Sequence, residues 1–456
     1  MLKGPSDLYP IEVTGDRIQM RKNPLFDILF GNSFDSIRWS PSLKEFDRVL
    51  TRREMEDLIA SQIKEFESNP QNIYFSQRTD SSLEVLVKVL SCFSLEKTLF
   101  VLPELSSENE IEKIQNFISK SFDFSQVPYE RRVLMLLTSG TSGLPKAVLV
   151  TQAQVLRQIA AVQSRLGLEE NHRVLVHLSL AHSGGLLMLL LPALAAQSEV
   201  HLIPPREPFL LQQALVSKEP SHFILRPFEY KRISQLTSSK DYLSRSSGVI
   251  TGSYAIPQWF VSELVSGGVP LWNVFGSTEF GPFAFSQKFS DPREPVRLGE
   301  PSSGFQFQFS KDSELLVRGD LVSAGHLEKP LQKGEWFKTG DLVSGRPPMA
   351  TFMGKRDRVI SRDGTFVSPM AVEEWIHQKL SDLGYLGDAL FALDEEGRAV
   401  LYIETPVELE SAEKNAIKKD FFSHFSKPFW PSRWNWSDRI PRNEFGKPSL
   451  KSSSSY

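Results

Sequence analysis

Hydrophobic positions along the chain follow two spacings, which predict helices and strands in alternation. Residues 52–66 place apolar side chains at helical intervals, whereas residues 97–102 and 131–137 are short apolar runs typical of buried strands. Further strands are predicted at 147–150, 173–178, 199–203 and 221–225, and a further helix at 152–165. This alternation favours an α/β fold, with a large N-terminal domain of mixed, largely parallel sheets flanked by helices.

The pattern changes near residue 310, where strands become shorter and turns more frequent. A charged stretch at 354–358 then precedes the last segment of the chain. Such a shift in composition is typical of a domain boundary. We therefore predict a large N-terminal domain at 1–353 and a small α+β C-terminal domain at 354–456.

Composition adds limits on the class of protein. At 456 residues the chain is too long for one ordinary hydrophobic core, and its 40% hydrophobic and 23% charged residues are typical of a globular protein. The formal net charge of −3 predicts no particular affinity for nucleic acid or an anionic membrane.

Cysteine usage and the apolar runs predict a soluble, cytoplasmic protein. Cys92 is the only cysteine, so no disulfide forms within the chain, as is usual in a reducing compartment. Residues 1–10 lack the apolar core of a signal peptide. The most apolar run, 186–196, contains Pro192 and is shorter than the roughly 20 residues that a membrane helix needs.

The loop L-T-S-G-T-S-G-L-P-K at 137–146 follows a predicted strand and combines features of a phosphate-binding loop. Glycines let the backbone approach a ligand closely, hydroxyls add donors, and a lysine supplies a point charge. The candidate ligand-binding residues of the loop are Thr138, Ser139, Gly140, Thr141, Ser142, Gly143 and Lys146. It lacks the Walker A spacing. The alternative is a surface turn, because Ser, Thr and Gly are ordinary turn residues.

Four further motif blocks follow this loop along the chain. They are V-F-G-S-T-E-F (274–280), G-E-W-F-K-T-G-D-L (334–342), G-K-R-D-R-V-I-S-R-D-G-T-F-V-S-P-M-A-V-E (354–373) and I-P-R-N-E-F-G-K (440–447). Together with the loop, these blocks resemble, in the same order, the motifs of the adenylate-forming enzymes, the superfamily of acyl-CoA synthetases, luciferases and peptide-synthetase adenylation domains. Ser142 and Ala147 depart from the usual loop, where Thr and Gly are common. The first 130 residues match poorly.

The resemblance implies a two-step reaction. A carboxylate attacks the α-phosphorus of ATP to give an acyl-adenylate and pyrophosphate, and the acyl group then passes to a thiol, most often that of coenzyme A. The loop would hold the β- and γ-phosphates. The implied cofactors are ATP, Mg²⁺ and coenzyme A.

The resemblance also implies roles for particular residues. Thr278 would contact phosphate, Glu279 would help to hold Mg²⁺, and Asp341 would accept hydrogen bonds from both ribose hydroxyls. Lys447 would bridge the substrate carboxylate and the α-phosphate, and Gly276 lies in the nucleotide-binding block. The alternatives are a solvated loop carboxylate for Glu279, a turn-forming Asp341 and a surface lysine for Lys447.

The hinge block implies a domain rotation. Asp357 matches the hinge position, and the pantetheine arm of the thiol would pass Gly364. Lys355 stands where the family usually has Arg. Since the two side chains are not equivalent at a fork-shaped contact, a ribose contact by Lys355 stays open.

Two further segments resemble the walls of the acyl pocket. His182, in A-H-S-G-G, resembles the gate between the pocket and the thiol tunnel, the alternative being a packed histidine. Gly252 and Tyr254 lie in a segment that resembles the pocket lining, and Tyr254 disfavours long fatty chains. Peptide-synthetase domains carry an aspartate near His182; its absence favours a simple carboxylic acid.

The acid itself is left open. The chain length and the L-P-K-A form of the loop resemble the o-succinylbenzoate–CoA ligases of menaquinone synthesis, and Arg226 would then face the second carboxylate of that acid. The alternative for Arg226 is a surface arginine. Two further hypotheses remain, namely an adenylation enzyme that loads a carrier protein and a binding protein whose catalytic site has decayed.

Overall fold

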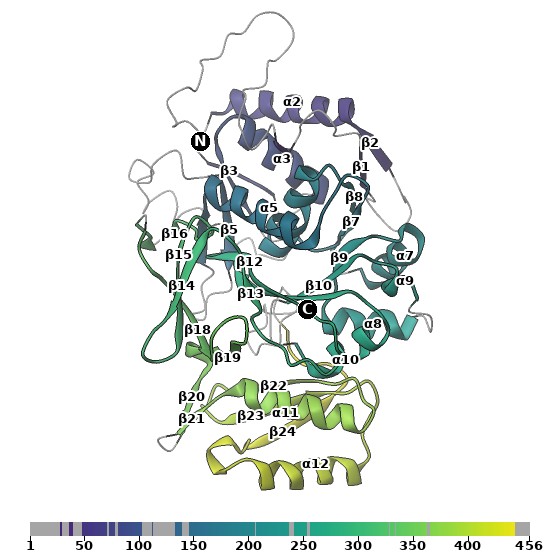
Figure 1. The fold of residues 1–456 in the computed structure, drawn as a ribbon, viewed down its shortest axis with the longest axis vertical. Coiled ribbons are helices and arrows are strands. Elements are labelled where there is room, and N and C mark those ends of the chain that lie inside the picture. The colour runs from purple at the N-terminus through teal and green to yellow at the C-terminus, as the bar shows by residue number, and fades with distance from the viewer. Residues whose placement is uncertain are drawn as a thin grey trace, which may run out of the picture.

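The computed structural model describes residues 28–29, 36–39, 48–70, 73–77, 81–102, 112, 133–138, 146–205, 207–236, 241–252, 256–327, 329–332, 334–362 and 365–442. These residues form an elongated molecule, with the sheets of the large N-terminal part above a smaller layer of helices and strands (Figure 1). The last part, residues 360–442, is called the C-terminal unit below.

A six-stranded sheet lies near the N-terminal helices. Its order is β17-β16-β6-β5-β4-β3, and β3, β4 and β5 run parallel. The strands are β3 (Ile73–Phe75), β4 (Thr98–Val101), β5 (Leu134–Thr138), β6 (Lys146–Val150), β16 (Gly325–His326) and β17 (Lys329–Pro330). Helices α2 (Arg52–Ser68) and α3 (Ser82–Ser94) each begin with a reciprocal capping box.

A nine-stranded sheet forms the centre of the large part, in the order β13-β12-β11-β10-β9-β7-β8-β1-β2. Its strands are β1 (Ser36–Trp39), β2 (Arg48–Thr51), β7 (Arg173–Val176), β8 (Glu199–Leu202), β9 (His222–Ile224), β10 (Gly248–Gly252), β11 (Leu271–Ser277), β12 (Gly281–Lys288) and β13 (Glu300–Pro301). The run from β11 to β1 is parallel, so the carboxyl ends of these strands share one edge, where ligands bind in open α/β sheets.

Helices cover both faces of this sheet because its strands bury side chains on both sides. Val174 and Val176 pack into one core with α5 (Gln152–Leu166), the π-helix at Gly184–Leu190 and α6 (Leu191–Ala195). Leu175 packs into a second core on the opposite face. That face is covered by α7 (Pro208–Lys218), α8 (Pro227–Leu236), α9 (Asp241–Ser244) and α10 (Gln258–Ser266).

The rest of the chain forms smaller sheets. An antiparallel sheet contains β14 (Phe305–Phe309), β15 (Glu314–Gly319), β18 (Phe337–Ser344) and β19 (Thr351–Lys355). A short 3₁₀ turn at Arg356–Arg358 leads to the C-terminal unit. That unit contains β20 (Ile360–Arg362), β21 (Thr365–Val367), α11 (Pro369–Asp382), β22 (Asp388–Leu393), β23 (Ala399–Glu404), α12 (Ser411–His424), a 3₁₀ turn (Lys427–Phe429) and β24 (Arg433–Ser437), and it has its own hydrophobic cluster.

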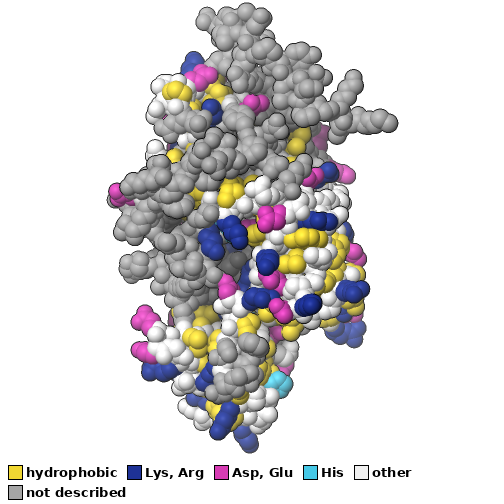
Figure 2. All heavy atoms as spheres, turned by 90° about the vertical axis from the view of Figure 1, so that its left-hand side faces the viewer, with side chains coloured by type: hydrophobic (Ala, Val, Ile, Leu, Met, Phe, Trp, Pro, Cys, Tyr) yellow, Lys and Arg dark blue, Asp and Glu magenta, His cyan; other side chains and the backbone are white. Residues whose placement is uncertain are grey.

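The structure confirms the predicted α/β class and the elements read from hydrophobic spacing, among them α2, α5, β4 and β7. The apolar run at 186–196 lies in the buried core as the π-helix and α6. No helix in the described part of the chain combines the length and the apolar character that crossing a bilayer requires. Basic and acidic side chains are mixed over the described residues of the face shown in Figure 2.

Candidate active site

Thr278 and Glu279 follow β11 at the carboxyl edge of the nine-stranded sheet, in a tight connection to β12. Gly276 is required there by close backbone packing. A Cβ atom at this position would lie 2.0 Å from the carbonyl oxygen of Gly281, which no side chain allows. The glycine of this block therefore lets β11 and β12 approach each other and fixes where the two polar side chains emerge.

Thr278 joins two predicted site segments. Its Oγ1 donates to Ser183 Oγ at 3.0 Å, and Gln154 Nε2 of α5 donates to its carbonyl oxygen at 2.8 Å. Ser183 immediately follows His182, whose Nδ1 accepts a hydrogen bond from the Gly184 amide at 3.0 Å. The structure thus brings together two predicted site segments. One contains His182, the predicted gate of the acyl pocket, and the other contains Thr278, which was predicted to contact phosphate.

Glu279 is held by residues from the six-stranded sheet. Its Oε1 lies 3.0 Å from His326 Nε2 on β16 and 3.5 Å from Thr138 Oγ1 at the end of β5. Burial alone would raise the pKa of Glu279. The hydrogen bonds from His326 and Ser277 outweigh this effect, with a contribution from the charge of Lys355, and the pKa is lowered to about 2. Glu279 is therefore ionised at neutral pH.

The oxygen donors around Glu279 suit an Mg²⁺ ion that shares its ligands with a substrate. They suit less well a metal ion whose ligands all come from the protein. Glu279 offers carboxylate oxygens and Thr138 a hydroxyl, both hard ligands. Among the described residues, no group of three or more His, Cys, Asp and Glu side chains is close enough to form a metal site. A single carboxylate beside the strand that leads into the predicted phosphate-binding loop is the pattern expected when Mg²⁺ takes its other ligands from substrate phosphates and water.

Asp341 and Lys355 form an ion pair across two strands. They are partners in the ladder between β18 and β19, and Lys355 Nζ lies 2.7 Å from Asp341 Oδ1. Lys355 also donates to the carbonyl oxygen of Thr339 at 3.1 Å. Desolvation disfavours the lysine charge, but the buried Asp341 carboxylate raises the pKa of Lys355 on balance. In this structure Lys355 thus pairs with the predicted ribose ligand and lowers the pKa of Asp341, but burial of Asp341 raises that pKa on balance.

Arg226 follows β9 at the same carboxyl edge and is buried, so it is not the surface arginine of the alternative interpretation. Its guanidinium forms an ion pair with Glu229, and its amide donates to Glu229 Oε2 at 2.9 Å. His177, after β7, lies 3.3 Å from Glu229 Oε1. Although burial opposes ionisation, Arg226 and His177 hold the pKa of Glu229 well below its usual range.

Gly252 ends β10 beside these residues. A Cβ atom there would lie 2.5 Å from the carbonyl oxygen of Val274, so a glycine is needed for β10 and β11 to pair at this edge. Lys146 begins β6, and its carbonyl oxygen accepts a hydrogen bond from Thr138 Oγ1 at 3.4 Å. Asp357 is exposed in the 3₁₀ turn before the C-terminal unit.

Part of the predicted site lies outside the described residues. This applies to the loop residues Ser139, Gly140, Thr141, Ser142 and Gly143, and to Tyr254, Gly364 and Lys447. Their predicted roles stay predictions.

Sequence patterns missed four residues that the structure places at the site, namely Gln154, Ser183, Glu229 and His326. Ser183 is adjacent to a predicted residue and could have been found from that position alone. His326 lies in no motif block, and its approach to Glu279 depends on β16 pairing with β6. Gln154 and Glu229 lie on helices whose apolar spacing carries no chemical signal.

Comparison with known proteins gives a family for this arrangement. The family model described as AMP-binding enzyme matches residues 64–325, more than half of the chain. The chain belongs to the AMP-binding enzyme family. The matched region runs from α2 to β16 and so includes Thr138, Lys146, Thr278 and Glu279.

Curated relatives of this AMP-binding enzyme are CoA ligases for several acids. It is 25% identical over 345 residues to indoleacetate–CoA ligase of Aromatoleum aromaticum, and the aligned region covers 71% of this chain and 66% of the relative. It is 23% identical over 370 residues to 2-succinylbenzoate–CoA ligase of Bacillus pumilus, covering 77% and 72%. It is 27% identical over 341 residues to medium-chain fatty-acid–CoA ligase of Escherichia coli, covering 69% and 59%.

Solved structures share the fold over nearly the whole chain. The o-succinylbenzoate CoA synthetase of Bacillus subtilis, in complex with its acyl-adenylate, has a TM-score of 0.74 at 18% identity, covering 94% of this chain and 98% of that one. ATP-bound MatB from Rhodopseudomonas palustris has a TM-score of 0.75 at 15% identity, covering 93% and 96%. At these identities the similarity establishes the fold.

Proposed function

We propose that this AMP-binding enzyme is an ATP-dependent acid–CoA ligase, which converts a carboxylate and ATP to an acyl-adenylate and pyrophosphate and then transfers the acyl group to coenzyme A. The observation that carries the proposal is the convergence of Thr138, Glu279 and the Asp341–Lys355 pair. Thr138 lies within 3.5 Å of Glu279, and the charge of Lys355 acts on both carboxylates. Three motif segments from different sheets thus meet in one place.

The residues of this site suit attack on an α-phosphate, a reaction in which positioning and charge compensation dominate. Glu279 is ionised and held from two sides, so it can present a fixed carboxylate toward the nucleotide. Mg²⁺ bound there would offset negative charge on the phosphates. Thr278, anchored by Gln154 and Ser183, would contact phosphate next to the acyl pocket.

Asp341 would bind the ribose hydroxyls, and Lys355 would pair with the Asp341 carboxylate until they arrive. Its side chain is 40% exposed, whereas that of Asp341 is 4% exposed, so the lysine can move and the aspartate is fixed.

The later steps of the proposal involve the C-terminal unit. Lys447 would bridge the substrate carboxylate and the α-phosphate during adenylation. Rotation at Asp357 would then bring Gly364 to the path of the thiol. The proposed domains are 1–353 and 354–456. Transfer to a carrier protein instead of coenzyme A is the second candidate, and an assay that offers both thiols separates the two.

A simple carboxylic acid is the proposed substrate class, with o-succinylbenzoate, and therefore menaquinone synthesis, as the first acid to test. A curated relative acts on 2-succinylbenzoate, but others act on indoleacetate and on medium-chain fatty acids. Arg226 is already paired with Glu229, so it would bind a second substrate carboxylate only by sharing its charge. A cytoplasmic location completes the proposal, supported by the single, buried Cys92.

The test is pyrophosphate release from ATP with Mg²⁺ and coenzyme A across o-succinylbenzoate, benzoates, indoleacetate and medium-chain fatty acids. Release with one acid, and turnover that depends on coenzyme A, is the expected result. Turnover of aromatic or medium-chain acids without o-succinylbenzoate would exclude the succinylbenzoate assignment. ATP binding without release for any acid would favour the carrier-protein candidate or a decayed site.

A further inference from the structure

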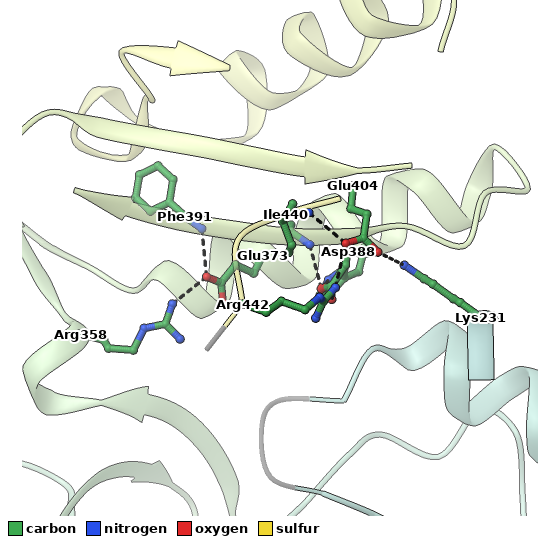
Figure 3. Close-up of polar contacts among 10 residues, drawn as sticks. Lys231, Arg358, Glu373, Asp388, Phe391, Glu404, Ile440 and Arg442 are labelled. Atoms are coloured by element: carbon green, nitrogen blue, oxygen red, sulfur yellow. Dashed lines mark hydrogen bonds and ion pairs between the residues drawn. The ribbon is translucent and has the colours of Figure 1, made fainter. Parts of the chain in front are cut away.

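Helix α8 of the large part presents two side chains to the C-terminal unit. Phe228 and Lys231 are three residues apart and therefore lie on one face of the helix. Lys231 is 8% exposed, and its Nζ lies 3.6 Å from Glu404 Oε1 at the end of β23 (Figure 3). The Phe228 ring centroid lies 5.2 Å from Arg442 Cζ, within the range of a cation–π interaction.

Arg442 is itself fixed by the C-terminal unit. One guanidinium nitrogen, Nη2, donates to Asp388 Oδ2 at 2.7 Å and to Glu404 Oε2 at 2.9 Å, and the Ile440 amide donates to the same Glu404 oxygen at 3.1 Å (Figure 3). The backbone from Ile440 to Arg442 is thus attached to two strands, β22 and β23. We call Lys231, Asp388, Glu404 and Arg442 the interdomain cluster.

The interdomain cluster brings together groups of both charges, and burial lowers the pKa of Lys231 on balance although Asp388 and Glu404 oppose this effect. Two carboxylates face one lysine and one arginine, and His377 of α11 lies 2.9 Å from Asp388 Oδ1. Burial opposes ionisation of Asp388, but His377 and Arg442 hold its pKa well below the usual range. Removing one partner would leave an uncompensated buried charge. The contacts therefore favour a single arrangement of α8, the strands β22 and β23, and the segment at 440–442.

The cluster also reaches the predicted acyl pocket. Arg226 Cζ lies 4.6 Å from the centroid of the same Phe228 ring that Arg442 contacts. Arg226 follows β9 and pairs with Glu229 at the carboxyl edge of the central sheet. Phe228 therefore lies between a wall of the proposed site and the segment that begins at Ile440.

From these contacts we propose that Arg442 is a positioning residue for adenylation. The interdomain cluster fixes the chain five residues before Lys447 against α8, and so sets where Lys447 enters the site. The proposal rests on the proposed function, since it assigns Lys447 to the adenylation step. It predicts that residues of α8, outside every motif block, affect that step through contact with the C-terminal unit.

The experiment compares Lys231→Met, Arg442→Lys and Arg442→Gln with a matched control, Lys379→Met. Lys379 pairs with Asp420 at 2.9 Å within the C-terminal unit, away from α8. Two steps are measured separately: acid-dependent exchange of pyrophosphate into ATP, and thioester formation from supplied acyl-adenylate. The acid is whichever of benzoate, octanoate and o-succinylbenzoate supports exchange in the unmodified protein. Hydrogen exchange of the backbone amides at 438–442, apart from Pro441, which has none, is measured without any ligand.

Lys231→Met is expected to lower pyrophosphate exchange by about 10-fold to 100-fold, as misplacement of a catalytic group by about 1 Å does. Thioester formation should not fall, and the amides at 438–442 should exchange faster. Arg442→Gln should act in the same direction, whereas Arg442→Lys should recover part of the exchange rate. Lys379→Met should match the unmodified protein in all three measurements.

Unchanged amide exchange in Lys231→Met would show that the cluster does not fix this segment, and would overturn the proposal. Equal loss of both chemical steps, or no loss of pyrophosphate exchange, would overturn the positioning role. Lys231→Met keeps the test independent of Arg442→Gln if that variant fails to fold. If none of the three acids supports pyrophosphate exchange in the unmodified protein, the proposed function fails. Amide exchange in Lys231→Met would still test whether the interdomain cluster fixes the segment at 438–442.

Discussion

The Nε2 atom of His326 lies 3.0 Å from Oε1 of Glu279, and the two residues come from different sheets. A hydrogen bond to a ligating carboxylate orients that carboxylate and commonly affects metal affinity by 10-fold to 100-fold. His326 therefore acts on the predicted magnesium ligand without being a motif residue.

His326→Phe should weaken binding of the metal–nucleotide complex by about 10-fold, whereas His326→Gln, which keeps a donor, should lose less. Because His326 is the first of the groups that hold the pKa of Glu279 at about 2 against burial, His326→Phe should also raise that pKa, and His326→Gln should raise it less. Titration of Mn²⁺ into protein with ATP, followed by electron paramagnetic resonance, measures the effect. Equal affinities in all three proteins would contradict it.

Lys355→Met should leave the buried Asp341 carboxylate without its partner. Because the Lys355 side chain is 40% exposed, the expected loss is about 1–3 kcal/mol of the free energy of unfolding, less than for a fully buried pair. Lys355→Arg should retain most of the stability. Urea denaturation provides the measurement, and Lys338→Met, at an exposed position of β18, is the control. A loss as large in the control would remove the ion pair as the cause.

Lys447→Ala should abolish acyl-adenylate formation and largely spare thioester formation from supplied acyl-adenylate. The reason is that a cation between two anionic groups is needed only while the carboxylate attacks the α-phosphate. The two steps are assayed separately, with Lys451→Ala as the control. If both steps fell together, the two-orientation mechanism would not apply to this enzyme.

His222 should make stability depend on pH. It is fully buried in β9, its Nε2 lies 3.2 Å from the Leu166 carbonyl oxygen, and burial together with the charge of His172 lowers its pKa to about 4. The unfolded chain, with an ordinary histidine pKa near 6.5, binds more protons between these values. Stability is therefore complete above about pH 6.5 and falls as the pH drops toward 4.

For His222 alone the free energy of unfolding should be about 2 kcal/mol lower at pH 5 than above pH 7. Chemical denaturation at both pH values measures the difference. His222→Gln, which keeps a donor toward Leu166, should show a smaller difference by that amount. If the free energy of unfolding changed equally with pH in both proteins, the pKa of His222 would not be lowered in the folded protein.

Much of the fold could be predicted from local spacing. Helix α2 was expected at 52–66 and runs from Arg52 to Ser68, and the strand expected at 131–137, which leads into the loop at 137–146, is β5. Short apolar runs and helical periodicity are local properties, so they can be recognised in the sequence of each segment without knowledge of the rest of the chain. The motif blocks likewise identified Thr278, Glu279 and Asp341 as candidates from neighbours within a few residues.

The environment of the candidates was not predictable in this way. Arg226 was expected at a substrate carboxylate or at the surface, yet it is buried against Glu229 and Phe228. Lys355 was uncertain because it replaces Arg, and its actual partner, Asp341, follows from the register of β18 and β19. Register and burial depend on how whole sheets pack, and they leave no pattern at the residue itself.

The sequence by itself therefore determined the order of helices and strands and the α/β class, and it named candidate residues for the chemistry, because local periodicity and short motifs encode these. Tertiary structure alone decided which residues meet. Glu279 and His326 are 47 residues apart, Thr278 and Ser183 are 95 apart, and Lys231 reaches Glu404 from another layer of the molecule. Such contacts arise from strand order, close packing and the balance of buried charge, which are properties of the folded chain as a whole.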